Sequence, residues 1–169
     1  MTVAQPDLVL AAASPRRSEL LAQAGVRYVV QVAGVDETLR DGEAPADYVE
    51  RLARAKAVAV LPQAGTLPVL GADTTVVVDD EILGKPADAA DAARMLARLS
   101  GREHRVLTAV AVCRGSELLS LTSETRVWFR RLDDRLIARY VATGEPLDKA
   151  GAYGIQGLGG TLVPRIDGS

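Results

Sequence analysis

Short apolar runs alternate along the chain with segments in which apolar residues recur at helical spacing. The strand-like runs are the opening one that starts at Leu8 and those at 28–32, 69–78, 105–113 and 118–129. The helix-like segments are the one that opens at Pro15 and those at 46–61, 89–99 and 133–143. Strands that alternate with helices, with no linker or repeat between them, predict one continuous α/β domain over residues 1–169.

Glycines mark where the predicted helices end. Gly25 is a plausible C-cap of the first helix, Gly101 follows the third and Gly144 closes the last, because glycine adopts the left-handed backbone of a helix end at little cost. Residues 149–160 contain too many glycines for a helix or a strand. We expect a loop there that permits close approach of the backbone.

Two segments have patterns that predict how they pack. The apolar stripe of the helix at 46–61 consists of Val49, Leu52, Ala53, Ala57 and Val60. Lys56 lies beside the edge of that stripe. The β-rich run at 69–78 ends at Asp79-Asp80 and is followed by a second short apolar run. This arrangement predicts a central strand or a bent hairpin.

Composition excludes several classes of protein. The chain has 169 residues, 48% of them hydrophobic, and a formal net charge of −2, so it lacks the broad basic surface of a nucleic-acid-binding protein. Aromatic residues make up only 4%, too few for a platform that stacks bases. Cys113 is the only cysteine, which favours a reducing compartment and a place in the core. No signal or membrane-spanning run is visible, so we expect a cytoplasmic protein that binds neither membrane nor nucleic acid.

The segment Ser14-Pro15-Arg16-Arg17 follows the first apolar run and opens the first helix. Ser14 is a good N-cap and Pro15 suits the first helical position, so backbone N–H groups there favour an anion. The guanidinium groups of Arg16 and Arg17 add donors suited to phosphate. The alternative is a capped surface helix with two solvated arginines.

Three further polar residues stand in contexts that invite a functional interpretation. Asp73 precedes three apolar positions of a strand, where an unpaired carboxylate is costly, although a turn or capping role is the alternative. Lys85 lies between a glycine and a proline and offers a point charge for phosphate, or is an ordinary exposed turn lysine. Gln156 carries an amide that both donates and accepts, which suits a base edge or simply solvent.

These residues belong to a larger ordered set that resembles the Maf family of nucleoside triphosphate pyrophosphatases. The matching positions are Ser14-Pro15-Arg16-Arg17, Glu19-Leu20-Leu21, Asp36-Glu37, Lys56, Gly71-Ala72-Asp73-Thr74, Gly84-Lys85-Pro86, Met95-Leu96, Leu99-Ser100-Gly101, His104 with Val106 and Thr108, and 148–157. Residues 72–74 and 149–156 are similar to the branch that acts on dTTP and UTP.

The resemblance implies a mixed α/β fold around a curved sheet, with flanking helices, a central cleft between two lobes and a homodimer as the usual assembly. It implies hydrolysis of dTTP and UTP, including modified pyrimidine nucleotides, to the monophosphate and pyrophosphate. Water would attack the α-phosphate with the help of a divalent cation, Mg²⁺ or Mn²⁺. Such a reaction requires neutralised charge and activated water.

The resemblance also implies roles for individual residues. Asp73 would activate water and contact the metal, with Glu37 as a second carboxylate for the metal. Phosphate oxygens would be held by Ser14, Arg16, Arg17, Lys56 and Lys85. Substrate choice is associated with Arg16, Thr74 and Gln156. His104, the only histidine, is expected to be structural.

The chain departs from the family pattern at two places. Relatives usually carry a serine where this chain has Ala12, and they continue beyond Ser169 into a further strand and a closing helix. A second hypothesis is a nucleotide-binding regulator of septum formation and cell division that does not hydrolyse its ligand. A P-loop nucleotidase is excluded because the motif G-x-x-x-x-G-K-[ST] is absent from the sequence.

Overall fold

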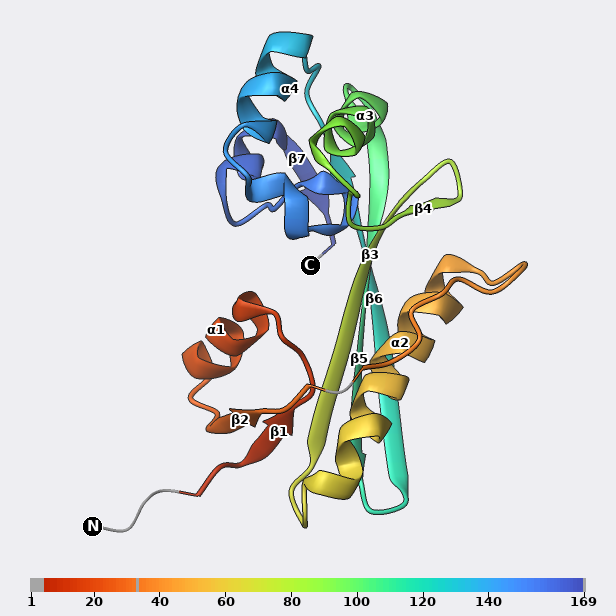
Figure 1. Ribbon diagram of the computed structural model, residues 1–169, viewed down its shortest axis with the longest axis vertical. Coiled ribbons are helices and arrows are strands. Elements are labelled where there is room, and N and C mark those ends of the chain that lie inside the picture. Colours follow the sequence, from red (N-terminus) through yellow and green to blue (C-terminus); the bar gives the residue numbers. More distant parts are fainter. Residues whose placement is uncertain (1–4, 33, 169) are drawn as a thin grey trace. The chain divides into compact units, whose positions relative to one another are not determined.

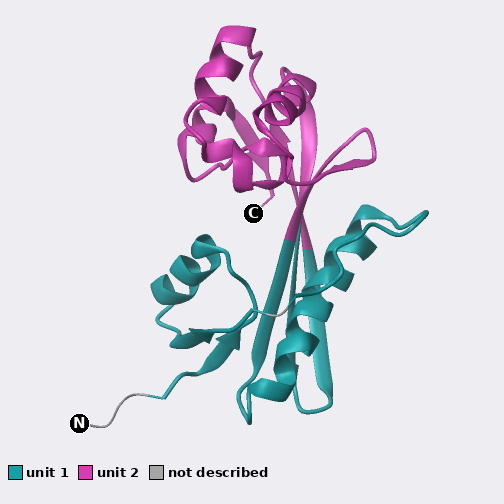
Figure 2. Cartoon of the chain, in the orientation of Figure 1, with its two compact units in different colours: residues 1–73, 108–122 teal, residues 74–107, 123–169 magenta. Residues whose placement is uncertain are grey.

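We describe the protein from a computed structural model that covers residues 5–32 and 34–168. Residues 1–4, Ala33 and Ser169, which the predicted domain includes, lie outside the described residues. The chain forms two compact units (Figure 2): unit 1 contains residues 1–73 and 108–122, and unit 2 contains residues 74–107 and 123–169. The family's single domain and its central cleft stay predictions.

The strands form one seven-stranded sheet in the order β2-β1-β3-β5-β6-β7, with β4 paired to β3 (Figure 1). The strands are β1 (Leu8–Leu10), β2 (Tyr28–Val30), β3 (Val69–Val78), β4 (Glu81–Leu83), β5 (Glu103–Arg114), β6 (Glu117–Trp128) and β7 (Arg165–Asp167). Pairing of β1 with β2 and β3 is parallel, whereas β4 pairs with β3 and β7 with β6 in antiparallel fashion. The predicted mixed α/β class is confirmed, and β3 is both a central strand and one arm of a hairpin.

Unit 1 begins with β1, helix α1 (Pro15–Gln23) and β2. Gly25 has φ +72° and its N–H donates to the carbonyl of Ala22, so the predicted helix end is confirmed. Ser14 occupies the N-cap with extended backbone angles, but its side chain makes no capping hydrogen bond. The predicted N-cap position is therefore confirmed, and the carbonyl of Ser14 accepts from the N–H groups of Arg17 and Ser18.

Helix α2 (Pro45–Val60) packs against β3 through the predicted stripe, all five residues of which are buried. A Cβ at Gly71 of β3 would lie only 2.7 Å from the backbone nitrogen of Ala57 and would overlap the carbonyl of Ala53. The helix backbone therefore touches the strand backbone at this point, which only glycine permits. A short 3₁₀ helix, η1 (Leu61–Gln63), follows α2.

Unit 2 has a continuous apolar core between helices α3 (Ala89–Leu99), α4 (Asp134–Val141) and the strand segments of that unit. Ala92, Leu96 and Leu99 of α3 are fully buried. Asp88 and Asp133 each cap a helix, because their carboxylates accept the N–H groups of Asp91 and Leu136. The predicted bounds of α3 are confirmed, and α4 covers all but the ends of its predicted segment, 133–143.

The glycine-rich segment differs from its prediction. Instead of an irregular loop it contains two 3₁₀ helices, η3 (Ala150–Ala152) and η4 (Leu158–Leu162), after a third, η2 (Glu145–Asp148). Close backbone approach is confirmed, because a Cβ at Gly151 would lie 2.8 Å from Val76. Strand β7 was not predicted, since three residues are too few for a periodic pattern.

Candidate functional site

Lys56 of α2 lies between two carboxylates of unit 1. Its Nζ is 2.6 Å from Oδ1 of Asp73 and 2.7 Å from Oε1 of Glu37. The side chains of Lys56 and Asp73 are only 16% and 13% exposed, whereas Glu37 is 55% exposed. Buried charges are costly unless they are paired, so the Lys56–Asp73 pair accounts for a carboxylate inside β3. We call Glu37, Lys56 and Asp73 the Lys56 cluster.

The packing of α2 on β3 brings Lys56 to Asp73. Gly71 lets the helix approach at Ala57, the neighbour of Lys56. Asp73 stands two residues after Gly71, and side chains two apart point to the same face of a strand. Asp73 is therefore within the strand and on the face that meets α2, which rules out the alternative of a turn or capping aspartate.

Glu37 is held in place by side chains of α2. The hydroxyl of Tyr48 donates to the carbonyl of Glu37 at 3.0 Å, and Nη2 of Arg51 donates to the carbonyl of Thr38 at 3.1 Å. Arg51 also forms two hydrogen bonds with the carboxylate of Glu43. Tyr48 and Arg51 are not among the predicted site residues, although their spacing of three residues places both on one side of a helix.

The charges of the Lys56 cluster affect its neighbours. Burial acts to lower the pKa of Lys56, but its hydrogen bonds to Asp73 and Glu37 outweigh that effect and raise the pKa above its usual value. Burial lowers the pKa of Arg17, with Arg16 adding to the fall and Asp73 opposing it. These charges show that Arg16 and Arg17 lie within electrostatic reach of one another and that Arg17 lies within reach of the cluster.

The remaining predicted site residues lie at different places. Ser14 and Arg16 are half-buried at the start of α1 in unit 1. Thr74 follows Asp73 directly in β3, and belongs with Lys85 and Gln156 to unit 2. Lys85 and Gln156 are both exposed. The structure thus brings Glu37, Lys56 and Asp73 into direct contact, with Arg17 within reach of their charge, while the role of each predicted site residue stays a prediction.

The carboxylate oxygens of the Lys56 cluster are suitable ligands for a divalent cation. Glu37 and Asp73 offer carboxylate oxygens, which Mg²⁺ and Mn²⁺ prefer, and both already contact one positive group, the ammonium of Lys56. Within residues 5–32 and 34–168, three or more His, Cys, Asp or Glu side chains nowhere gather as a ligand set. Two carboxylates suit an ion that keeps water and substrate oxygens among its ligands.

His104 and Cys113 have the structural surroundings expected for them. His104 is 2% exposed, its Nε2 lies 2.7 Å from the hydroxyl of Tyr153, and its ring makes edge contacts with Phe129 and Tyr153. Burial lowers the pKa of His104 from 6.5 to about 4. Cys113 is a buried free cysteine.

Comparison with known proteins adds to this picture. The family model described as Maf-like protein matches residues 7–169. A protein of Escherichia coli O6:K15:H31 named dTTP/UTP pyrophosphatase is 55% identical over 164 residues, which are 96% of this chain and 83% of the relative. A protein of the same name from Symbiobacterium thermophilum is 56% identical over 162 residues, which are 96% of this chain and 84% of the relative.

A solved structure supports the fold. The Ham1 protein of Staphylococcus aureus has a TM-score of 0.52 and 15% sequence identity, with 72% of this chain and 71% of that chain covered. At this identity the likeness concerns the fold alone. In the part of the chain that the structure describes, no helix is both long and apolar enough to span a bilayer.

Proposed function

The chain belongs to the Maf family, and we propose from this premise that it is a nucleoside triphosphate pyrophosphatase. The observation that carries the proposal is the 55% identity, over 96% of this chain, with a protein named dTTP/UTP pyrophosphatase. The Lys56 cluster supplies two carboxylates and a positive group, which this chemistry needs.

The residues of unit 1 can perform the central step. The carboxylate of Asp73 would accept a proton from water as the water oxygen attacks the α-phosphorus, and the bond to the pyrophosphate oxygen breaks. Lys56 keeps its positive charge and can turn from the carboxylates to phosphate oxygens. Arg17 and Arg16 would hold further phosphate oxygens beside it, together with Ser14 at the start of α1.

A divalent cation, Mg²⁺ or Mn²⁺, would be held by Glu37 and Asp73. When bound, it would neutralise phosphate charge and position the reacting oxygens. The half-exposed carboxylate of Glu37 can reorient toward an ion at small cost, while Asp73 is fixed by the strand. Tyr48 and Arg51 keep the backbone of Glu37 near α2.

We propose dTTP and UTP, including modified pyrimidine nucleotides, as the substrates. Gln156 would read the pyrimidine edge with its amide, and Arg16 and Thr74 would contribute to substrate choice. Lys85 would add a positive charge for phosphate. A homodimer in the cytoplasm is the expected assembly and location. A regulator that binds without hydrolysis is not favoured, because the named relatives are enzymes.

The test is release of pyrophosphate from dTTP, UTP, CTP, GTP and 7-methyl-GTP with Mg²⁺ or Mn²⁺. In ¹⁸O-labelled water, attack at the α-phosphorus places the label in the monophosphate and none in pyrophosphate. We expect dTTP and UTP to be hydrolysed and Asp73→Asn to lose activity by about 100-fold or more. Label in the released pyrophosphate, or binding without release, would contradict the proposal.

A matched control is Asp79→Asn. Asp79 follows the same strand, is paired with Arg102, and has φ +52°, a conformation that asparagine adopts readily. The same change of acid to amide there should leave pyrophosphate release within about twofold of the unchanged protein, as for most surface substitutions. Equal losses in both variants would show that Asp73 has no special role.

A further inference from the structure

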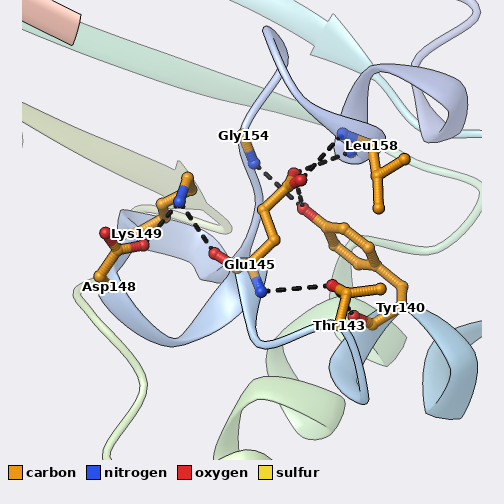
Figure 3. A network of polar contacts seen from close by, with 8 residues as sticks. Tyr140, Thr143, Glu145, Asp148, Lys149, Gly154 and Leu158 are labelled. Carbon is orange, nitrogen blue, oxygen red and sulfur yellow. Dashed lines mark hydrogen bonds and ion pairs between the residues drawn. The ribbon is translucent and has the colours of Figure 1, made fainter. Parts of the chain in front are cut away.

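Glu145, the first residue of η2, is the centre of a polar network in unit 2 (Figure 3). Its carboxylate accepts three hydrogen bonds: from the hydroxyl of Tyr140 at 2.7 Å, from the N–H of Leu158 at 2.9 Å and from the N–H of Gly159 at 3.0 Å. Two of these donors belong to the backbone just after Gln156. We call Tyr140 and Glu145 the Glu145 hub.

The same hub holds the backbone just before Gln156. The N–H of Gly154 donates to the hydroxyl of Tyr140 at 3.2 Å, so that hydroxyl bonds both to Glu145 and to the segment. Figure 3 shows Gly154 and Leu158 converging on these two side chains. Residues 154–159 are therefore fixed at both ends by one pair of side chains, with Gln156 between the fixed points.

Packing around the hub is tight at two glycines. A Cβ at Gly157 would lie 2.5 Å from Oε2 of Glu145, and a Cβ at Gly159 would lie 2.5 Å from the hydroxyl of Tyr140. Neither glycine is required by a positive φ, because Gly151 is the only glycine of residues 149–160 with a positive φ. The glycines on either side of Leu158 thus serve the close approach of the backbone to the hub.

The charge of Glu145 suits this role. Burial acts to raise its pKa, but the hydrogen bonds from Gly159, Tyr140 and Leu158 outweigh burial and bring the pKa below its usual value. Glu145 therefore stays ionised at neutral pH and accepts from all its donors. An ionised acceptor forms stronger hydrogen bonds than a neutral one, so the segment is held firmly.

We infer that Glu145, together with Tyr140, is a positioning residue that sets the conformation of the Gln156 segment and thereby the discrimination between pyrimidine bases. The inference rests on the proposed function of Gln156. Uracil and cytosine present opposite donors and acceptors on the edge that an amide would read, so the orientation of the Gln156 amide decides which base is preferred. Glu145 itself does not contact substrate in this arrangement.

The test measures binding of the α,β-methylene analogues of UTP and CTP by calorimetry, which needs no turnover. The variants are Glu145→Gln, Gln156→Ala and the double variant. We expect Glu145→Gln to reduce the ratio of UTP to CTP affinity by about fivefold to tenfold, the worth of one hydrogen bond. In the Gln156→Ala background the same change should alter the ratio by less than about twofold.

The matched control is Glu81→Gln, an exposed carboxylate of unit 2 that is paired with Arg98. It removes the same charge and should leave the affinity ratio unchanged. If Glu145→Gln fails to fold, Tyr140→Phe carries the same test, because it removes one hydroxyl that serves both Glu145 and Gly154. Hydrogen exchange at Leu158 and Gly159 should quicken in Glu145→Gln and not in Glu81→Gln.

The outcomes separate this inference from the proposed function. An unchanged affinity ratio in Glu145→Gln, or equal effects of that change with and without Gln156, overturns the positioning role. Absence of nucleotide binding or of a preference for the UTP analogue overturns it as well. Failure of the proposed function would be seen separately, as no release of pyrophosphate from dTTP and UTP. The binding comparison would still be interpretable in that case, because it needs no turnover.

Discussion

The Lys56 cluster of unit 1 and the Glu145 hub of unit 2 place a charged side chain among several partners by different means. Lys56 contacts two full negative charges, both on side chains. The carboxylate of Glu145 accepts from a hydroxyl and two backbone N–H groups, all of them uncharged, while the ammonium of Lys149 donates to the backbone carbonyl of Glu145 and not to its carboxylate. The first arrangement is built from ions, and the second from dipoles that belong largely to the backbone.

The difference bears on what each region can do. Side-chain ions can exchange partners, as the proposed binding of phosphate or a metal ion at the Lys56 cluster requires. Backbone dipoles cannot leave without unfolding the segment, so the Glu145 hub is a fixed support. We therefore assign chemistry to the Lys56 cluster and positioning to the Glu145 hub.

Removing the central charge of the Lys56 cluster gives the largest predicted effect on catalysis, whereas removing that of the Glu145 hub should affect binding alone. Lys56→Met leaves Glu37 and Asp73 without their shared cation and removes the proposed phosphate ligand, so kcat/KM for UTP should fall by about 1,000-fold. Glu145→Gln should change KM and leave kcat within about threefold, because it acts only on binding. Steady-state kinetics of pyrophosphate release measures both.

Arg54→Met is the control for Lys56→Met. Arg54 lies on the same helix and is also paired with a carboxylate, that of Glu50, but not with the Lys56 cluster. The kcat/KM of Arg54→Met should stay within about twofold of the value for the unchanged protein. A fall in kcat as large for Glu145→Gln as for Lys56→Met would remove the distinction between the two regions.

Glycine substitutions probe the rigidity of the two regions. Gly71→Ala pushes a methyl group into the backbone of α2, which cannot move aside, so we expect a loss of about 3 kcal/mol in the free energy of unfolding. Gly157→Ala meets the carboxylate of Glu145, a side-chain end that can shift only by weakening its hydrogen bonds to the backbone, and should cost about 1 kcal/mol, the worth of one such bond. Urea denaturation followed by circular dichroism compares the two, and equal costs would contradict the prediction.

His104 gives a pH dependence that can be traced to one residue, since the chain has a single histidine. Its pKa is about 4 when folded, against 6.5 ordinarily, so the unfolded chain binds more protons between these values. The contribution of His104 to stability is therefore complete above pH 6.5 and is lost as the pH falls toward 4. Between pH 7 and pH 5 the contribution of His104 to the free energy of unfolding should fall by about 2 kcal/mol.

The measurement is urea denaturation at pH 7, 6 and 5 with His104→Gln as the reference. Carboxylates titrate in both proteins, so their effect cancels in the difference. The stability of the unchanged protein relative to His104→Gln should decrease by that amount on going from pH 7 to pH 5. A constant difference across this range would show that His104 is not buried in its neutral form.

Much of the fold follows from local patterns. The stripe on α2, the strand at 69–78 and the helix at 89–99 were predictable because apolar periodicity over ten or more residues leaves one face to bury. The 3₁₀ helices after α4 were not, because close contact with Glu145 and Val76, and not periodicity, shapes the backbone there. Strand β7 depends on its pairing with β6, which three residues do not reveal.

The candidate site was predictable in its residue types and only partly in its contacts. Asp73 and Lys56 could be singled out because each is a charge beside apolar neighbours, yet their direct pairing depends on how Gly71 lets α2 approach β3. Tyr48 and Glu145 were missed, because a helix-surface tyrosine and a turn glutamate look ordinary in a sequence. Their importance comes from partners 11 and 14 residues away along the chain.

The smallest predicted effect concerns Thr143, which links α4 to the Glu145 hub. Its hydroxyl donates to the carbonyl of Tyr140 at 2.6 Å and accepts from the N–H of Glu145 at 3.2 Å. Thr143→Ala should lower the free energy of unfolding by about 1 kcal/mol, whereas Thr143→Ser keeps the hydroxyl and should cost less than about 0.5 kcal/mol.

Thr161→Ala is the matched control for this change. The hydroxyl of Thr161 also donates to a carbonyl three residues earlier, that of Leu158, but within residues 5–32 and 34–168 no backbone N–H donates to it. We expect urea denaturation to give Thr161→Ala roughly half the cost of Thr143→Ala. The affinity ratio for the UTP and CTP analogues should stay constant in both, because the three donors to the Glu145 carboxylate remain. A changed ratio in Thr143→Ala alone would mean that the hub is held by its helix connection and not by the carboxylate.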